Sequence, residues 1–126
     1  MLEITPSLDP GLLKKYCKQC GKVFGPQFYL YLAKERETLL GAGLFEMMSD
    51  RVQVVLYEGD TADAWVFDAV LRAGLNYAAG QGVSVGCLPE AFRQAHADFF
   101  NQLNYPDWAE FDITNFFQKY KNCGRV

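Results

Sequence analysis

The segment of residues 52–80, VQVVLYEGDTADAWVFDAVLRAGLNYAAG, places the tightest constraint on how this chain can fold. The β-branched and other apolar residues at positions 52–57 predict a largely buried strand, which Gly59 ends. No proline interrupts the helical pattern of residues 62–79, and Gly80 supplies its stop. The segment is therefore predicted to form one strand, a short turn and one long helix.

The turn between this strand and this helix is a candidate anion site. The first N–H groups of a helix have no partner within it, and the helix dipole adds positive potential at the same point. Asp60 or Thr61 is predicted to cap the helix by accepting a bond from one of these N–H groups. Whether the turn still holds an anion decides most of the functional interpretation.

Composition narrows the class of protein. The chain has 126 residues, half of them hydrophobic and 15% aromatic, which predicts a single domain over residues 1–126 with a sizeable core. A net charge of −3 without a basic cluster argues against a nucleic-acid partner. No apolar run approaches the ~20 residues that span a bilayer, and the start of the chain does not have the pattern of a signal peptide. We therefore expect no membrane partner and a cytoplasmic location.

The remaining segments predict alternating strands and helices. A strand at residues 2–4 precedes a helix that Asp9 caps and Gly21 ends. Short turns then separate three strands, which implies an antiparallel meander, with the strands at residues 27–34, 38–48 and 52–57. After the long helix we expect a strand parallel to the third of these at residues 83–88, one helix at 89–103, a strand at 108–113 and a short helix from Thr114 through Tyr120.

This order of elements resembles the GNAT-type N-acetyltransferases over residues 2–113. The opening MLEITPSLDPGLLKKY is similar to that family's first strand and helix, and LLGAGLFEMM with VQVVLYEG to its central meander. The segment ADFFNQLNY is similar to the end of its fourth helix. The resemblance implies an α/β fold, with a mixed, mostly antiparallel twisted sheet and helices on both faces. It also implies acetyl-CoA as the cofactor of an active member.

The family holds acetyl-CoA at the strand-to-helix turn, through the pattern Arg/Gln-x-x-Gly-x-Gly/Ala. The matching stretch here is EGDTAD, in which only the glycine fits. Glu58 stands where a basic residue is expected, and two charges ~4 Å apart interact by roughly 4 kcal/mol at an effective dielectric constant near 20. That exceeds the ~0.3–1 kcal/mol per charge that an exposed helix terminus contributes. Acidic residues here also have a structural explanation, because they stabilise the helix dipole themselves. If CoA binds, the resemblance implies contacts with Leu56, Tyr57, Gly59, Thr61, Ala62 and Asp63.

The proton donor of the family is also altered. Many of these enzymes carry a tyrosine on the fourth helix that protonates the departing thiolate, and its place here is taken by Phe100, which has no proton to give. Tyr105 is near in sequence and is the catalytic candidate if the protein is active, although it matches a packing position of the family. Losing a general acid lowers a rate by ~10²–10⁴.

The parts that bind the acceptor amine in the family are reduced here. Residues 21–26 are too few for a second helix, and the chain after Ile113 reads as helix instead of a last strand. The sequence thus departs from the family at the cofactor turn, at the proton donor and at the acceptor site.

Three other features of the sequence have both a functional and a structural interpretation. Cys17 and Cys20 form half of a zinc motif, but structural zinc needs four ligands, so free thiols at a helix end are favoured. His96 has no Ser or Cys partner in the pattern and is expected to be structural. Asp68 and Arg72 are four residues apart and are expected to form a surface pair.

We hypothesise that the chain is a degenerate acyltransferase domain that has lost its chemistry. It would bind a ligand or a protein, and a homodimer is one possible state. The alternative is an active acetyl-CoA-dependent N-acetyltransferase that holds the coenzyme through backbone contacts on the strand of residues 52–57, with Tyr105 or a water as proton donor. A third alternative is a small zinc-dependent interaction module.

Overall fold

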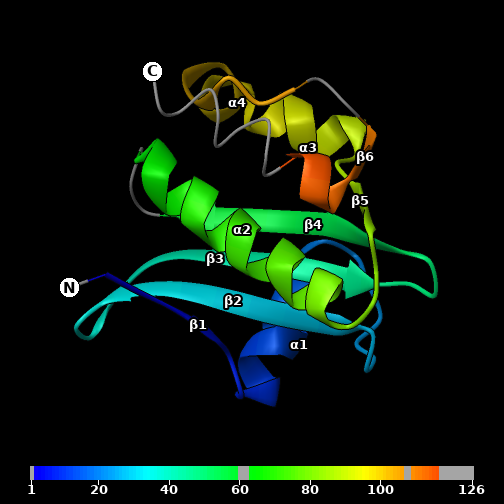
Figure 1. The fold of residues 1–126 in the computed structure, drawn as a ribbon. Coiled ribbons are helices and arrows are strands. Elements are labelled where there is room, and N and C mark those ends of the chain that lie inside the picture. Colours follow the sequence, from blue (N-terminus) through cyan, green and yellow to red (C-terminus); the bar gives the residue numbers. More distant parts are fainter. Residues whose placement is uncertain (1, 60–62, 107–108, 117–126) are drawn as a thin grey trace.

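The computed structural model describes residues 2–59, 63–106 and 109–116 (Figure 1). In these residues six strands form one sheet in the order of the sequence. The strands are β1 (Leu2–Pro6), β2 (Phe28–Glu35), β3 (Thr38–Met47), β4 (Arg51–Gly59), β5 (Val85–Cys87) and β6 (Glu110–Asp112). The helices are α1 (Pro10–Gln19), α2 (Ala64–Gly80), α3 (Glu90–Ala95) and α4 (Ala97–Leu103).

The sheet is mixed and mostly antiparallel. Strands β1 to β4 pair antiparallel with their neighbours, β5 runs parallel to β4, and β6 is antiparallel to β5. The parallel pair results from the crossover through α2, as the strand–helix–strand spacing predicts. The predicted α/β fold class and the antiparallel meander are confirmed.

Helix α1 covers one face of the sheet. The Asp9 carboxylate accepts a hydrogen bond from the Gly11 N–H at 2.9 Å, and Pro10 occupies the first helical position. Gly21 follows the helix with a φ of +72°, a left-handed conformation that favours glycine. Beneath α1 lies a small apolar cluster made of Tyr16, Cys17, Phe28, Leu30, Leu32, Ala42 and Leu44.

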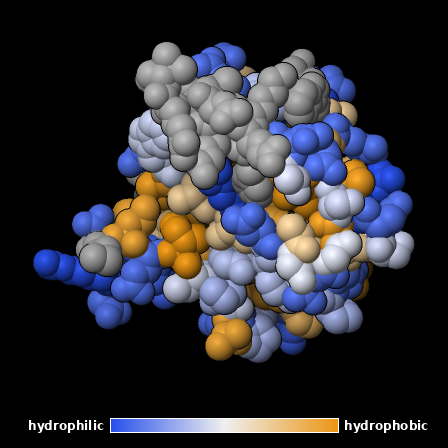
Figure 2. Space-filling model, viewed as in Figure 1, coloured by the Kyte–Doolittle hydropathy of each residue, from blue (hydrophilic) through white to orange (hydrophobic). Residues whose placement is uncertain are grey.

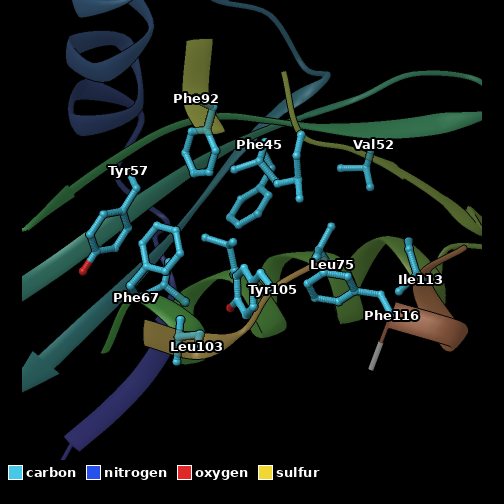
Figure 3. Close-up of a cluster of buried hydrophobic side chains, with 14 of the residues drawn as sticks. Phe45, Val52, Tyr57, Phe67, Leu75, Phe92, Leu103, Tyr105, Ile113 and Phe116 are labelled. Atoms are coloured by element: carbon cyan, nitrogen blue, oxygen red, sulfur yellow. The ribbon is translucent and has the colours of Figure 1, made fainter. Parts of the chain in front are cut away.

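Helix α2 covers the opposite face together with α3 and α4. Its inner side buries the larger core, in which Phe45, Phe67 and Leu75 are fully covered (Figure 3). Gly74 is needed for this packing, because a Cβ there would overlap the ring of Phe45. Helices thus lie on both faces, and α3 and α4 lie beside β4, far from β1 (Figure 1).

The prediction of a single helix at residues 89–103 is wrong, because two helices, α3 and α4, meet there at His96. His96 has φ −120° and ψ 30°, outside the helical region. The chain has neither glycine nor proline at this point. The break leaves Phe92 and Phe100 buried on one side, so the apolar spacing does not reveal it.

The segment after β6 also differs in detail. Residues 113–116 are helical, and the Asp112 carboxylate accepts a bond from the Asn115 N–H at 3.0 Å. Asp112 therefore caps this turn instead of Thr114, and the predicted continuation to Tyr120 lies outside the described residues. Between α1 and β2, the described residues 20–27 form turns and no helix.

The surface of the α2 face is mixed. Apolar residues gather between β1 and the first half of α2, whereas hydrophilic residues dominate the periphery (Figure 2). Among the described residues, every helix falls short of the length and apolar character that a membrane span requires.

Candidate functional site

The candidate site begins at the open edge of β4. This strand pairs with β3 along most of its length, but with β5 over three residues only, from Arg51 opposite Val85 to Gln53 opposite Cys87. Beyond Gln53 the two parallel strands part, and the carboxyl-terminal half of β4 has no pairing with β5. An unpaired strand edge offers backbone N–H and C=O groups to a ligand.

A β-bulge lies where the two strands part. Leu44 pairs with Leu56 and Phe45 with Val54, so Val55 is an extra residue with no counterpart on β3. As a result Val55 and Leu56 both pack on the α1 side. The expected cofactor contacts Leu56 and Tyr57 therefore direct their side chains to opposite faces of the sheet, and only their backbone shares the strand edge.

The turn after β4 is bounded by Gly59 and Asp63. The predicted cap at Asp60 or Thr61 is wrong, because Asp63 is the N-cap of α2 and its carboxylate accepts a hydrogen bond from the Trp65 N–H at 2.9 Å. The helix consequently begins at Ala64 instead of residue 62. Thr61 and Ala62, two of the expected cofactor contacts, lie outside the described residues. A carboxylate of the chain itself thus occupies the position where an anion would meet the helix N-terminus.

Tyr57 closes the end of β4 on the α2 side. Its hydroxyl is buried and makes no hydrogen bond with the described residues. A Cβ at Gly41 would lie 2.5 Å from this hydroxyl and one at Gly59 2.8 Å from it, so the phenol covers both glycines. Burial, together with the Asp63 carboxylate, raises the pKa of Tyr57 to about 12. The phenol is therefore a neutral donor at physiological pH.

Glu58 faces the other side of the sheet. Its carboxylate accepts a hydrogen bond from the Gln19 side-chain amide at 2.5 Å, at the end of α1. It lines a hollow of about 150 Å³ with Lys15 and Tyr16. Glu58 and Asp63 therefore do not converge on one point, although both flank the turn.

The catalytic candidate Tyr105 is buried. Its hydroxyl donates to Asp68 Oδ1 at 2.5 Å, and Arg72 Nε donates to Asp68 Oδ2 at 2.8 Å. The expectation of a surface pair is wrong for Asp68, which is only 6% exposed. The contact between Tyr105 and Asp68 spans 37 positions, and the only sign of it in the sequence is an acidic residue within an apolar helix. Phe100, which the resemblance aligns with the family's proton donor, is buried in the same core.

Aromatic rings fill the space between the open half of β4 and α2. The ring centroid of Phe67 lies 4.9 Å from that of Tyr57 and 4.7 Å from that of Phe99. The imidazole of His96 joins this group, 5.7 Å from Tyr57 and 5.4 Å from Phe67. Burial lowers the pKa of His96, so its imidazole is neutral at pH 7.

The cysteines do not form a metal centre within the described residues, where no three His, Cys, Asp or Glu side chains gather. Cys17 is buried, and burial raises the pKa of its thiol. The Cys20 thiol donates to the Tyr16 carbonyl at 3.3 Å. Cys123 lies outside the described residues.

At the level of sequence, no family model and no curated protein matches the chain. Solved structures with a similar fold include the ribosomal-protein-S18-alanine N-acetyltransferase of Escherichia coli, at 14% identity and a TM-score of 0.61, over 86% of this chain and 79% of that one. A GNAT-family protein from Desulfovibrio desulfuricans matches at 8% identity and a TM-score of 0.62, over 90% of this chain and 99% of that one. An N-acetyltransferase from Staphylococcus aureus matches at 12% identity and a TM-score of 0.60, over 90% and 99% of the two chains.

Proposed function

Because the chain has the fold of the GNAT-type N-acetyltransferases, we propose that it is a non-catalytic domain of this fold that binds a ligand or a protein. One observation carries the proposal. The Asp63 carboxylate caps α2 at the turn where the resemblance would place the diphosphate of acetyl-CoA. The helix N-terminus is thereby satisfied from within the chain.

A bound diphosphate would have to approach this carboxylate. Like charges at ~4 Å repel by roughly 4 kcal/mol at an effective dielectric constant near 20. The remaining N–H groups of the helix terminus offset only ~0.3–1 kcal/mol per charge at an exposed site. The balance therefore disfavours a nucleotide diphosphate at this turn.

The proton-transfer groups support the same proposal. Phe100 has no exchangeable proton, and the Tyr105 hydroxyl already donates to the buried Asp68 carboxylate. A general acid must reach the group that it protonates, at about 2.6–3.2 Å or through one water. Tyr105 is 8% exposed, which does not favour such an approach.

Thermal unfolding measured with and without CoA or acetyl-CoA, paired with an assay for CoA release in the presence of a panel of amines, tests the proposal. We expect no thermal stabilisation by either compound, whereas a true ligand at a hundredfold excess over its Kd stabilises by ~2.7 kcal/mol. We also expect no CoA release above the uncatalysed rate. Acetyl transfer to any amine would overturn the proposal in favour of the active N-acetyltransferase, with the coenzyme held by the backbone of β4.

A protein partner or a second copy of the chain is the other part of the proposal. Trp65, on the first turn of α2, is 67% exposed, and aromatic residues of this kind are enriched at interfaces. Light scattering coupled to gel filtration gives the mass in solution. If the protein is a dimer and Trp65→Ser dissociates it, the result would support an interface at α2. If the unsubstituted protein is a monomer, a second copy of the chain is excluded as the partner.

A further inference from the structure

The break between α3 and α4 opens a hollow of about 270 Å³ in the surface. Its polar wall consists of Gln94, His96, Asp98 and Gln102, and Phe99 forms part of its apolar wall. A hollow of this size admits a small molecule or one end of a longer chain.

His96 is the most constrained polar group of the hollow. Its ring is held by contacts with Tyr57, Phe67, Phe92 and Phe99, at centroid distances of 4.8–6.1 Å. Its ring nitrogens make no hydrogen bond with the residues that the structure describes. A neutral imidazole has one acceptor nitrogen and one donor, so a half-buried His96 has hydrogen-bonding capacity to offer a ligand.

The other polar groups add acceptors. Asp98 is the one charged residue in the described wall of the hollow, and it is acidic. The Gln94 amide nitrogen donates to Glu90 Oε1 at 3.1 Å, which leaves its carbonyl oxygen available to accept. An aliphatic ammonium has three N–H donors and no acceptor, so its hydrogen-bonding pattern complements this wall. The ring of Phe99 adds an aromatic surface, which attracts cations.

We propose that this hollow binds the ammonium group of an aliphatic amine, with the imidazole of His96 and the carboxylate of Asp98 as its principal acceptors. The inference does not require acetyl transfer, since it concerns binding alone. The described residues that line the hollow belong to α3, α4 and their junction, and none of them belongs to the turn that Asp63 caps.

The proposal predicts how the affinity for the ammonium ligand depends on pH. The titratable groups around His96 are Tyr57 from β4 and Asp98 on the wall, while α2 and α3 present Phe67 and Phe92. Tyr57 stays protonated between pH 5.5 and 8, because burial raises its pKa to about 12, and an aliphatic amine stays an ammonium below about pH 10. Burial lowers the pKa of His96 from its ordinary 6.5, so its imidazole gains a proton in acid. A protonated His96 loses its acceptor and repels the ligand, so affinity falls as the pH falls through the pKa of His96.

NMR spectroscopy of the imidazole tests the proposal directly. The chain has one histidine, so its ring resonances identify themselves. The full-length protein is titrated to about 50 mM with butylammonium, so that binding in the millimolar range is also detected. Butanol, butyrate and tetramethylammonium, at matched ionic strength, separate shape, charge sign and N–H donation. We expect saturable shifts of the His96 resonances with butylammonium only, and a lowered pKa of His96 in its presence.

Two variants complete the test. Asp98→Asn should weaken butylammonium binding about tenfold or more, whereas Glu3→Gln, which makes the same charge change on β1, should leave it unchanged. Equal weakening by both variants, equal shifts with tetramethylammonium, or affinity that does not fall when the His96 resonances show the ring to be protonated would overturn the proposal. Acetyl transfer, if it were found, would overturn the proposed function and leave this result untouched.

Discussion

At the scale of the residue, the buried carboxylate of Asp68 depends on two donors, Tyr105 and Arg72. Tyr105→Phe removes a hydrogen bond to a charged group, and we expect it to lower the free energy of unfolding by about 1.5–3 kcal/mol. Urea denaturation measures the change. Tyr77→Phe is the matched control, because Tyr77 is 43% exposed and should lose less than about 0.5 kcal/mol. Similar losses in both variants would contradict the role given to Asp68.

The hydroxyl of Tyr57 should behave in the opposite way. It is buried without a partner among the described residues, and an unsatisfied buried donor costs ~1–3 kcal/mol. Tyr57→Phe keeps the ring that covers Gly41 and Gly59 and removes the hydroxyl. We expect the free energy of unfolding to rise by about 1 kcal/mol in the same urea experiment. A loss of stability would mean that this hydroxyl has a partner in solution.

At the scale of the element, α2 is fixed against the sheet by one close approach. Gly74→Ala adds a methyl group where the ring of Phe45 already lies, and overpacking costs ~1–3 kcal/mol even though alanine favours helices by ~1 kcal/mol. Gly80→Ala, at the end of the same helix, meets no atom within 4 Å and should stabilise by ~0.4–1 kcal/mol. Thermal unfolding of the two variants should therefore shift in opposite directions. Stabilisation by both would show that β3 and α2 are not in close contact.

The junction of α3 and α4 should make stability depend on pH. Burial lowers the pKa of His96 below its ordinary 6.5, so the unfolded state binds its proton first as the solution is acidified. This contribution to stability is fully present above pH 6.5 and is lost as pH falls through the folded-state pKa. The slope is at most ~1.4 kcal/mol per pH unit. We expect His96→Gln to flatten the curve of unfolding free energy between pH 7.5 and 5.5; a slope that survives the substitution would have another origin.

The positions of most strands and helices were predictable, because a regular spacing of apolar residues indicates both the type of element and the face that it buries. Residues 27–34 and 38–48 were placed within a residue or so of β2 and β3. The bulge at Val55 and the break at His96 were not predictable, since each depends on a neighbour that is distant in the sequence. The cap at Asp63 is a local contact with the Trp65 N–H, but Asp60 and Thr61 in the same stretch are equally good capping residues, so the sequence did not single it out. The bulge requires the register of β3, and the break accompanies contacts of the imidazole with Tyr57 and Phe67.

At the scale of the whole molecule, β4 and β5 part beyond Gln53, and two carboxylates, those of Glu58 and Asp63, flank the turn that follows β4. The sequence identified the acidic character of the turn but not its geometry. In the sequence Glu58 and Asp63 are two similar acidic residues of one turn. In the structure the Glu58 carboxylate accepts a hydrogen bond from Gln19 on α1, whereas the Asp63 carboxylate caps the N-terminus of α2. The two carboxylates should therefore differ in how strongly they oppose an anion at the turn.

This difference gives a prediction about CoA. Asp63→Ser keeps a good N-cap and removes the charge at the helix terminus, so it should raise the affinity for CoA about tenfold, a modest part of the ~4 kcal/mol estimated for close charges. Glu58→Gln removes the same charge on the α1 side and should change the affinity by less than about twofold. Calorimetry at low ionic strength compares the two variants, and added salt should reduce the gain from Asp63→Ser. Equal gains in affinity would indicate an effect of net charge alone, and no gain in affinity from either variant would contradict the role given to the Asp63 carboxylate.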